Sequence, residues 1–143
     1  MDSSSWADQR RENARARAAL LRAEQEQEYA AGRALLARFV EAAREGGPAP
    51  EPLFVTHPGN GARARTPLRG WYLRDNRSMG VDVDGNFYLL TAPLTLLERL
   101  RGVRPEPADP PLILGKGGRD GETIDLVDAL TRVWPDWQKR ARG

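Results

Sequence analysis

The sequence predicts an α+β fold, in which a long N-terminal helix precedes a small antiparallel sheet with two C-terminal helices. Three observations support this class. No proline interrupts the chain before Pro48, where a Gly-Gly-Pro sequence is a strong helix stop. Beyond this stop the apolar residues alternate with polar ones, as in half-buried strands, and helical spacing returns in the last third. We therefore expect a long amphipathic helix in residues 1–47 and a small α+β domain in residues 48–143.

The long helix is predicted to run from Trp6 to Glu45, with Ser5 as its N-cap. An apolar stripe lies on one face of its C-terminal half, formed by Tyr29, Leu36, Phe39, Val40 and Ala43 with Leu35 beside them. The N-terminal half has mostly alanine at its apolar positions, and the segment RAEQEQE (residues 22–28) breaks any heptad seam. We expect the C-terminal half to pack on the domain. The N-terminal half should project from it or pair with another chain, as in a coiled coil.

The predicted domain contains short elements in a fixed order. The segments PLFVTH (residues 52–57) and LRGWYLR (68–74) are typical of strands. The segment MGVDVDGNFYLLTAP (79–93) predicts a hairpin that turns at Asp84-Gly85. A short helix is expected from Leu94 to Leu100 and a last strand in PLILG (111–115). A final helix should run from Ile124 to Trp134, where Pro135 ends or kinks it.

A basic and aromatic segment precedes the predicted hairpin. The candidate nucleic-acid-binding residues are Arg63, Arg65, Arg69, Trp71, Arg74 and Arg77. Basic groups that follow a phosphate backbone, with aromatic rings that stack on bases, are typical of single-strand binders. On a strand, however, Trp71 and Tyr72 point to opposite faces, so only one of them can join a stacking platform. The alternative is that one ring fills the core while the arginines pair with Asp82, Asp84 and acidic helix ends.

The stretch LILGKGGRDGET (residues 112–123) joins a strand to a helix through glycines. Gly115 and Gly117 match the first two glycines of a dinucleotide fingerprint, but Asp120 occupies the third position. A Walker loop would need Ser or Thr after Lys116, and acidic residues at the start of the next helix repel phosphate. We expect a turn that is open to a protein partner. Small-anion binding is the alternative, through the loop residues Gly115, Lys116, Gly117, Gly118 and Arg119.

The composition argues against several chemistries. The absence of cysteine excludes disulfides and thiolate metal sites, and the single histidine, His57, argues against a catalytic triad. Asp82 and Asp84 project to one side of the predicted hairpin, where carboxylates more often increase solubility than catalyse. No segment has the length and apolarity of a membrane span or a signal peptide. We expect a cytoplasmic protein with no catalytic residues, no metal, no cofactor and no membrane partner.

The segments LRGWYLRDNRSMGVDVDGNFYLLTAP (68–93) and DPPLILGKGGRDGETI (109–124) resemble a family of small proteins of unknown function from GC-rich actinobacteria. These proteins similarly place an Arg- and Ala-rich helix before such a domain, and the resemblance implies no functional residue. From the residues themselves we expect a non-catalytic interaction or regulatory protein. Its domain would supply a binding surface, and its helix would serve for self-association or docking to a protein partner. Binding of RNA or DNA and binding of a small anion are the alternatives.

Overall fold

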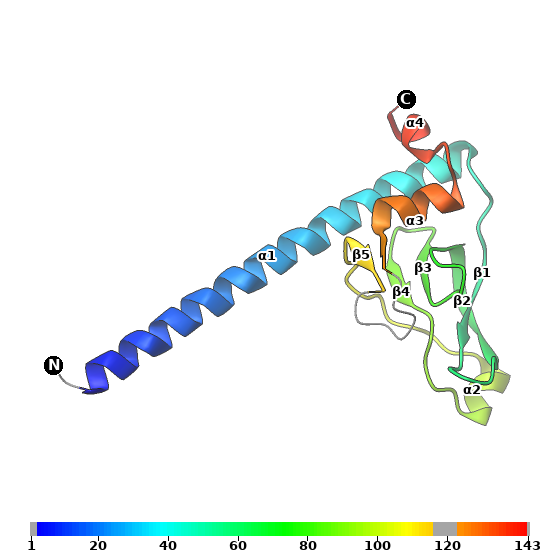
Figure 1. Cartoon of the computed structure of the whole chain (residues 1–143). Coiled ribbons are helices and arrows are strands. Elements are labelled where there is room, and N and C mark those ends of the chain that lie inside the picture. Colours follow the sequence, from blue (N-terminus) through cyan, green and yellow to red (C-terminus); the bar gives the residue numbers. More distant parts are fainter. Residues whose placement is uncertain (1–2, 116–122, 143) are drawn as a thin grey trace.

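The computed structural model describes residues 3–115 and 123–142 and confirms the predicted α+β fold (Figure 1). In chain order the described elements are α1 (Ser3–Gly46), β1 (Glu51–Thr56), β2 (Arg63–Tyr72), β3 (Met79–Asp82), β4 (Phe87–Leu89), α2 (Leu96–Arg101), β5 (Ile113–Leu114), β6 (Ile124–Asp125), α3 (Leu126–Val133) and α4 (Trp137–Arg142). Figure 1 shows α1 as one continuous helix whose N-terminal half extends away from the rest of the chain.

The strands β1 to β4 form an antiparallel sheet in the order β1-β2-β3-β4, so that each strand pairs with the next one along the chain. Trp71 of β2 lies opposite Val81 of β3, and Val81 lies opposite Phe87 of β4, which places all three on one face. The predicted turn between β3 and β4 is confirmed. Gly85 there has a φ of +88°, a conformation that glycine adopts without strain.

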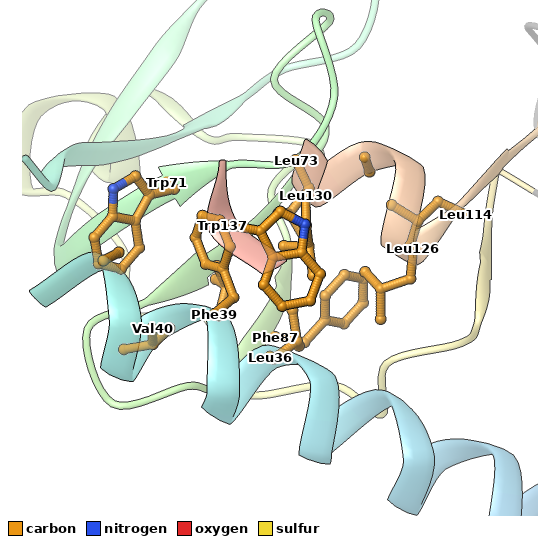
Figure 2. Close-up of a cluster of buried hydrophobic side chains, with 13 residues drawn as sticks. Leu36, Phe39, Val40, Trp71, Leu73, Phe87, Leu114, Leu126, Leu130 and Trp137 are labelled. Atoms are coloured by element: carbon orange, nitrogen blue, oxygen red, sulfur yellow. The ribbon is translucent and has the colours of Figure 1, made fainter. Parts of the chain in front are cut away.

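The two faces of this sheet are covered by two separate hydrophobic cores. The larger core lies between the sheet and the helices α1, α3 and α4, and its fully buried members include Leu36, Phe39, Val81, Leu114, Leu126, Leu130 and Trp137. Figure 2 shows Phe39 of α1 beside Trp71 and Trp137 in this core. The smaller core lies on the opposite face and consists of Leu53, Val55, Ala64, Tyr88, Leu90 and Leu94.

The domain first contacts α1 about halfway along the helix. The proline-rich connection before β5 crosses α1 at Gly32, where a Cβ atom would lie 2.5 Å from the carbonyl oxygen of Pro110. Beside this crossing, the Glu28 carboxylate accepts a hydrogen bond of 3.2 Å from the backbone N–H of Leu112. From Leu36 onward the predicted apolar stripe is buried in the larger core. The prediction that the C-terminal half of α1 packs on the domain is therefore confirmed.

The ends of several elements differ from the prediction. The helix α1 begins at Ser3, so Ser5 lies inside its first turns and the prediction that it caps the helix is wrong. The strand β2 begins at Arg63 and not at Leu68, because Ala64 pairs with Val55 of β1. Local sequence preferences alone do not show where α1 or β2 begins.

The C-terminal region also differs in detail. Ile124 starts a strand, β6, and not a helix, because its backbone pairs with Leu114. The final predicted helix is confirmed only from Leu126 to Val133. A further helix, α4, follows Pro135, and Trp137 at its start is buried against α1.

Candidate interaction sites

The projecting half of α1 is a surface that the described domain leaves uncovered. Every side chain from Asp8 to Gln27 is exposed, and at 1.5 Å per residue this segment extends over about 30 Å. Its large apolar side chains are open to solvent as well, with 60% of Leu20 and 60% of Leu21 exposed. Most helices in proteins are stabilised by tertiary packing of one face. Among the described residues, no other element covers this segment.

The contacts that do exist within the projecting half are local. Asp8 and Arg11 form an ion pair of 3.2 Å one turn apart, and both side chains are largely exposed. The Gln25 amide donates a hydrogen bond of 2.9 Å to the Tyr29 hydroxyl. Exposed pairs of this kind contribute little to stability. The Arg10 guanidinium also lies over the Trp6 ring at 4.6 Å, but Leu20 and Leu21 remain largely exposed.

An uncharged stripe runs along the projecting half with the alternating spacing of three and four residues that is typical of coiled coils. Its members are Trp6, Gln9, Asn13, Ala16, Leu20, Ala23 and Gln27. We call this set the helix stripe. In heptad terms Trp6, Asn13, Leu20 and Gln27 occupy a positions, and Gln9, Ala16 and Ala23 occupy d positions. Leu21 lies beside the helix stripe at a b position.

The helix stripe faces away from the domain. At about 100° per residue, Ala16 and Leu20 both lie about 160° around α1 from Leu36, which is buried against the sheet. A second helix can therefore lie along the stripe without meeting the domain. Large apolar residues do not mark this stripe, since three of its seven members are amides. It is marked by the absence of charge in a helix that is otherwise rich in Arg and Glu, and it continues through Ala23 and Gln27 of the segment in which we expected no heptad seam.

The basic segment does not form one continuous platform in the structure. Arg63, Arg65 and Arg69 are exposed, but each guanidinium group contacts a different part of the chain. These contacts are Arg63 over the Phe54 ring at 4.6 Å, Arg65 Nη2 to the Leu100 carbonyl at 3.1 Å, and Arg69 Nη2 to the Pro50 carbonyl at 3.1 Å. The arginines thus support neighbouring elements in addition to carrying charge.

Trp71 is a core residue, and its predicted role in an exposed stacking platform is wrong. Its side chain is only 3% exposed, and its indole N–H donates a hydrogen bond of 3.0 Å to the Pro48 carbonyl. Tyr72 packs toward the opposite core, as strand alternation predicts. Its hydroxyl accepts a hydrogen bond of 2.8 Å from the backbone N–H of Phe54, and the guanidinium of Arg77 lies over its ring.

The structure brings Arg74 and Arg77 together with a third arginine, Arg132 of α3, which the sequence does not single out. They line an open groove of about 770 Å³ between the β2–β3 turn, the linker after α1, and α3. Glu51 and Asp75 also line this groove and offset part of its positive charge. Arg74 Nη1 donates to the Leu114 carbonyl at 3.5 Å. The groove is a polar surface with mixed charge.

Of the predicted glycine loop, the structure describes Gly115, which follows β5 with a φ of +82°. The other loop residues, Lys116, Gly117, Gly118 and Arg119, lie outside the described residues. Small-anion binding at this loop therefore stays a prediction.

Asp82 is a structural hydrogen-bond acceptor. Its buried carboxylate accepts bonds from the backbone N–H groups of Asp84 and Asn86, both at 2.9 Å, and from the Tyr88 hydroxyl at 3.0 Å. Burial, followed by the hydrogen bond to Asp82 and its charge, raises the pKa of Tyr88 to about 12. Asp82 and Asp84 therefore do not act as a pair of exposed carboxylates, because Asp82 is used to shape the β3–β4 turn.

His57 also has a structural partner, since its Nδ1 accepts a hydrogen bond of 2.9 Å from the backbone N–H of Leu94. Among residues 3–115 and 123–142, no group of three or more His, Asp or Glu side chains is placed to hold a metal ion. The same residues contain no helix that is long and apolar enough to cross a membrane. Comparison of the chain with protein-family models, with curated proteins and with solved structures finds no match.

Proposed function

We propose that this chain is a non-catalytic interaction protein that forms a parallel homodimer through the helix stripe of α1. The observation that carries this proposal is the uninterrupted exposure of α1 from Asp8 to Gln27, on a helix whose other half is firmly packed. A second copy offers the same uncharged stripe at the same spacing. Two such helices can bury Trp6 and Leu20 against each other.

The residues along the stripe favour the parallel arrangement. In a parallel pair Asn13 meets Asn13 of the partner subunit, and a single buried asparagine at an a position sets register and orientation in coiled coils. Glu12 and Arg17 occupy the g and e positions, so each Glu12 lies beside Arg17 of the partner subunit. In an antiparallel pair, a positions lie opposite d positions, so the two Asn13 side chains would not meet.

The oligomeric state tests the interface. Leu20 and Leu21 are equally exposed, but only Leu20 belongs to the helix stripe. We expect sedimentation equilibrium to show a dimer for the natural chain and for Leu21→Glu, and a monomer for Leu20→Glu, because a charge at an a position is buried by pairing. A natural chain that is monomeric at every concentration contradicts the proposal, as does equal dissociation of the two variants.

The orientation can be tested by disulfide trapping, because the natural chain has no cysteine. In a parallel pair the two copies of Ala16 face each other at a d position, within reach of a disulfide. Ala16→Cys is therefore expected to crosslink under mild oxidation, whereas Ala14→Cys, exposed at a b position, is not. A dimer in which neither variant crosslinks points to the antiparallel arrangement.

The two other predicted functions remain alternatives. Nucleic-acid binding through Arg63 to Arg77 predicts an affinity that falls steeply with salt. Because Trp71 is buried, bases cannot stack on its ring in this mode of binding. Small-anion binding at the glycine loop predicts that phosphate-containing compounds raise the melting temperature of the protein.

A further inference from the structure

The short helix α2 turns its apolar face toward solvent and its charged face toward the domain. Its leucines face solvent, with exposed fractions of 75% for Leu96, 57% for Leu97 and 74% for Leu100. The side chains that are half-buried are the charged ones, Glu98 and Arg99. Helices on a protein surface normally bury their apolar face and expose their charges. Apolar side chains gathered on one exposed element mark an interaction site.

Several contacts hold α2 in this orientation. Thr95 and Glu98 form a capping box at its start, through a hydrogen bond of 3.1 Å from the Glu98 N–H to Thr95 Oγ1 and one of 2.9 Å from the Thr95 N–H to Glu98 Oε1. At its end, Arg65 of β2 donates to the Leu100 carbonyl, and Gly102 leaves the helix with a φ of +91°. The three leucines are therefore presented by a fixed element and not by a loose loop.

A basic hollow lies directly beside the exposed leucines. It has a volume of about 550 Å³ and lies between β2 and the segment that follows α2, and three arginines line it: Arg65, Arg101 and Arg104. Glu98, the acidic residue of α2, is already engaged by the capping box. The hollow and the leucines together form what we call the α2 surface, with an apolar part and an adjoining positive part. Figure 1 places α2 at the end of the domain opposite to α1, α3 and α4.

We propose that the α2 surface binds an acidic amphipathic segment of a partner protein. The leucines require an apolar partner, and the three arginines require carboxylates next to it, a combination that an amphipathic acidic helix presents on one side. A nucleic acid supplies phosphates but no aliphatic surface for the leucines. This surface is distinct from the helix stripe, and the proposal does not depend on dimer formation.

The test uses the full chain and a fluorescently labelled model peptide of about 14 residues, with leucines at helical spacing and glutamates elsewhere. A matched peptide carries lysine in place of every glutamate. We expect the acidic peptide to raise fluorescence anisotropy to saturation and the lysine peptide not to bind. Leu97→Gln should weaken the acidic peptide by about tenfold, as expected for an anchor residue, whereas Leu21→Gln, with similar exposure on α1, should leave it unchanged.

Charge reversal gives the second part of the test. The double variant Arg101→Glu/Arg104→Glu is expected to lose the acidic peptide and to gain the lysine peptide, with an unchanged far-UV circular dichroism spectrum. Equal affinity for the two peptides, or no binding of either, overturns the proposal. Tighter binding to a single-stranded oligonucleotide overturns it in favour of nucleic acid. Tighter binding to phosphatidylcholine vesicles with about 30% phosphatidylserine overturns it in favour of a membrane surface.

Discussion

Replacement of Phe39 by alanine is expected to cause one of the largest losses of stability of any single substitution in this chain. Phe39 is fully buried and lies at the point where α1 meets the sheet and the C-terminal helices. Its ring makes edge contacts with three tryptophans, at centroid distances of 5.7 Å to Trp71, 6.3 Å to Trp134 and 5.8 Å to Trp137. All three ring pairs are lost in the alanine variant.

The expected magnitude follows from these contacts. A buried Phe→Ala substitution costs about 3–5 kcal/mol, and each edge-to-face aromatic pair contributes about 0.5–1.5 kcal/mol beyond simple burial. Because three such pairs are lost together, we expect a value of about 4–5 kcal/mol for Phe39→Ala. Domains of this size have a total stability of about 5–15 kcal/mol, so the variant should remain folded only marginally.

Urea unfolding followed by tryptophan fluorescence measures this loss, because three of the four tryptophans report on the same core. The near-UV circular dichroism of these tryptophans should weaken as well, since their rings lose a rigid neighbour. The matched control is Arg38→Ala, an exposed neighbour on the same helix, with an expected change within about 0.5 kcal/mol. A loss below about 2 kcal/mol for Phe39→Ala, with an unchanged near-UV spectrum, would refute the idea that this ring joins α1 to the domain.

Two further predictions concern the sheet. Gly70→Ala should destabilise the chain by more than about 3 kcal/mol in urea unfolding, because its Cβ would overlap the Val81 carbonyl oxygen, whereas Gly46→Ala, with open space around it, should cost nothing. Equal effects of the two substitutions would contradict the close pairing of β2 and β3. The pKa of Tyr88 is raised to about 12 from 10.0, so between these values the folded chain keeps a proton that the unfolded chain releases. Stability should therefore fall by about 3 kcal/mol as the pH rises through this window, and Tyr88→Phe should lack this part of the loss. The same pH dependence in both proteins would show that Tyr88 ionises normally.

The parts of the fold that the sequence predicts are those determined by local chemistry. The end of α1 follows from its Gly-Gly-Pro stop, and the β3–β4 hairpin follows from Asp84-Gly85, whose glycine has the positive φ that the turn requires. The elements it misses, β6 and α4, are short and depend on contacts with residues outside their own segments. Ile124 is extended because it meets Leu114, and Trp137 is buried because α1 lies beneath it.

The candidate sites are predicted less well than the fold. Strand alternation predicts that Trp71 and Tyr72 face opposite sides, but only the tertiary packing shows that Trp71 lies in the core with α1. The spacing of Leu96, Leu97 and Leu100 is that of an ordinary buried helix face. Their exposure depends on which side of α2 meets β2, and the composition of six residues does not determine this.

The continuity of α1 has a mechanical consequence. α1 is one unbroken helix from Ser3 to Gly46, so its packed half and its projecting half keep a fixed rotation about the helix axis. The direction in which the helix stripe faces therefore determines the direction in which the domain lies around that axis. One residue inserted between Gln27 and Glu28 would turn the domain by about 100° and shift it by about 1.5 Å. Seven inserted residues would nearly restore the phase while moving the domain about 10 Å along the axis. In the proposed dimer, the number of residues between the helix stripe and Gly32 thus determines whether each α2 surface points toward the dimer axis, sideways or away from it.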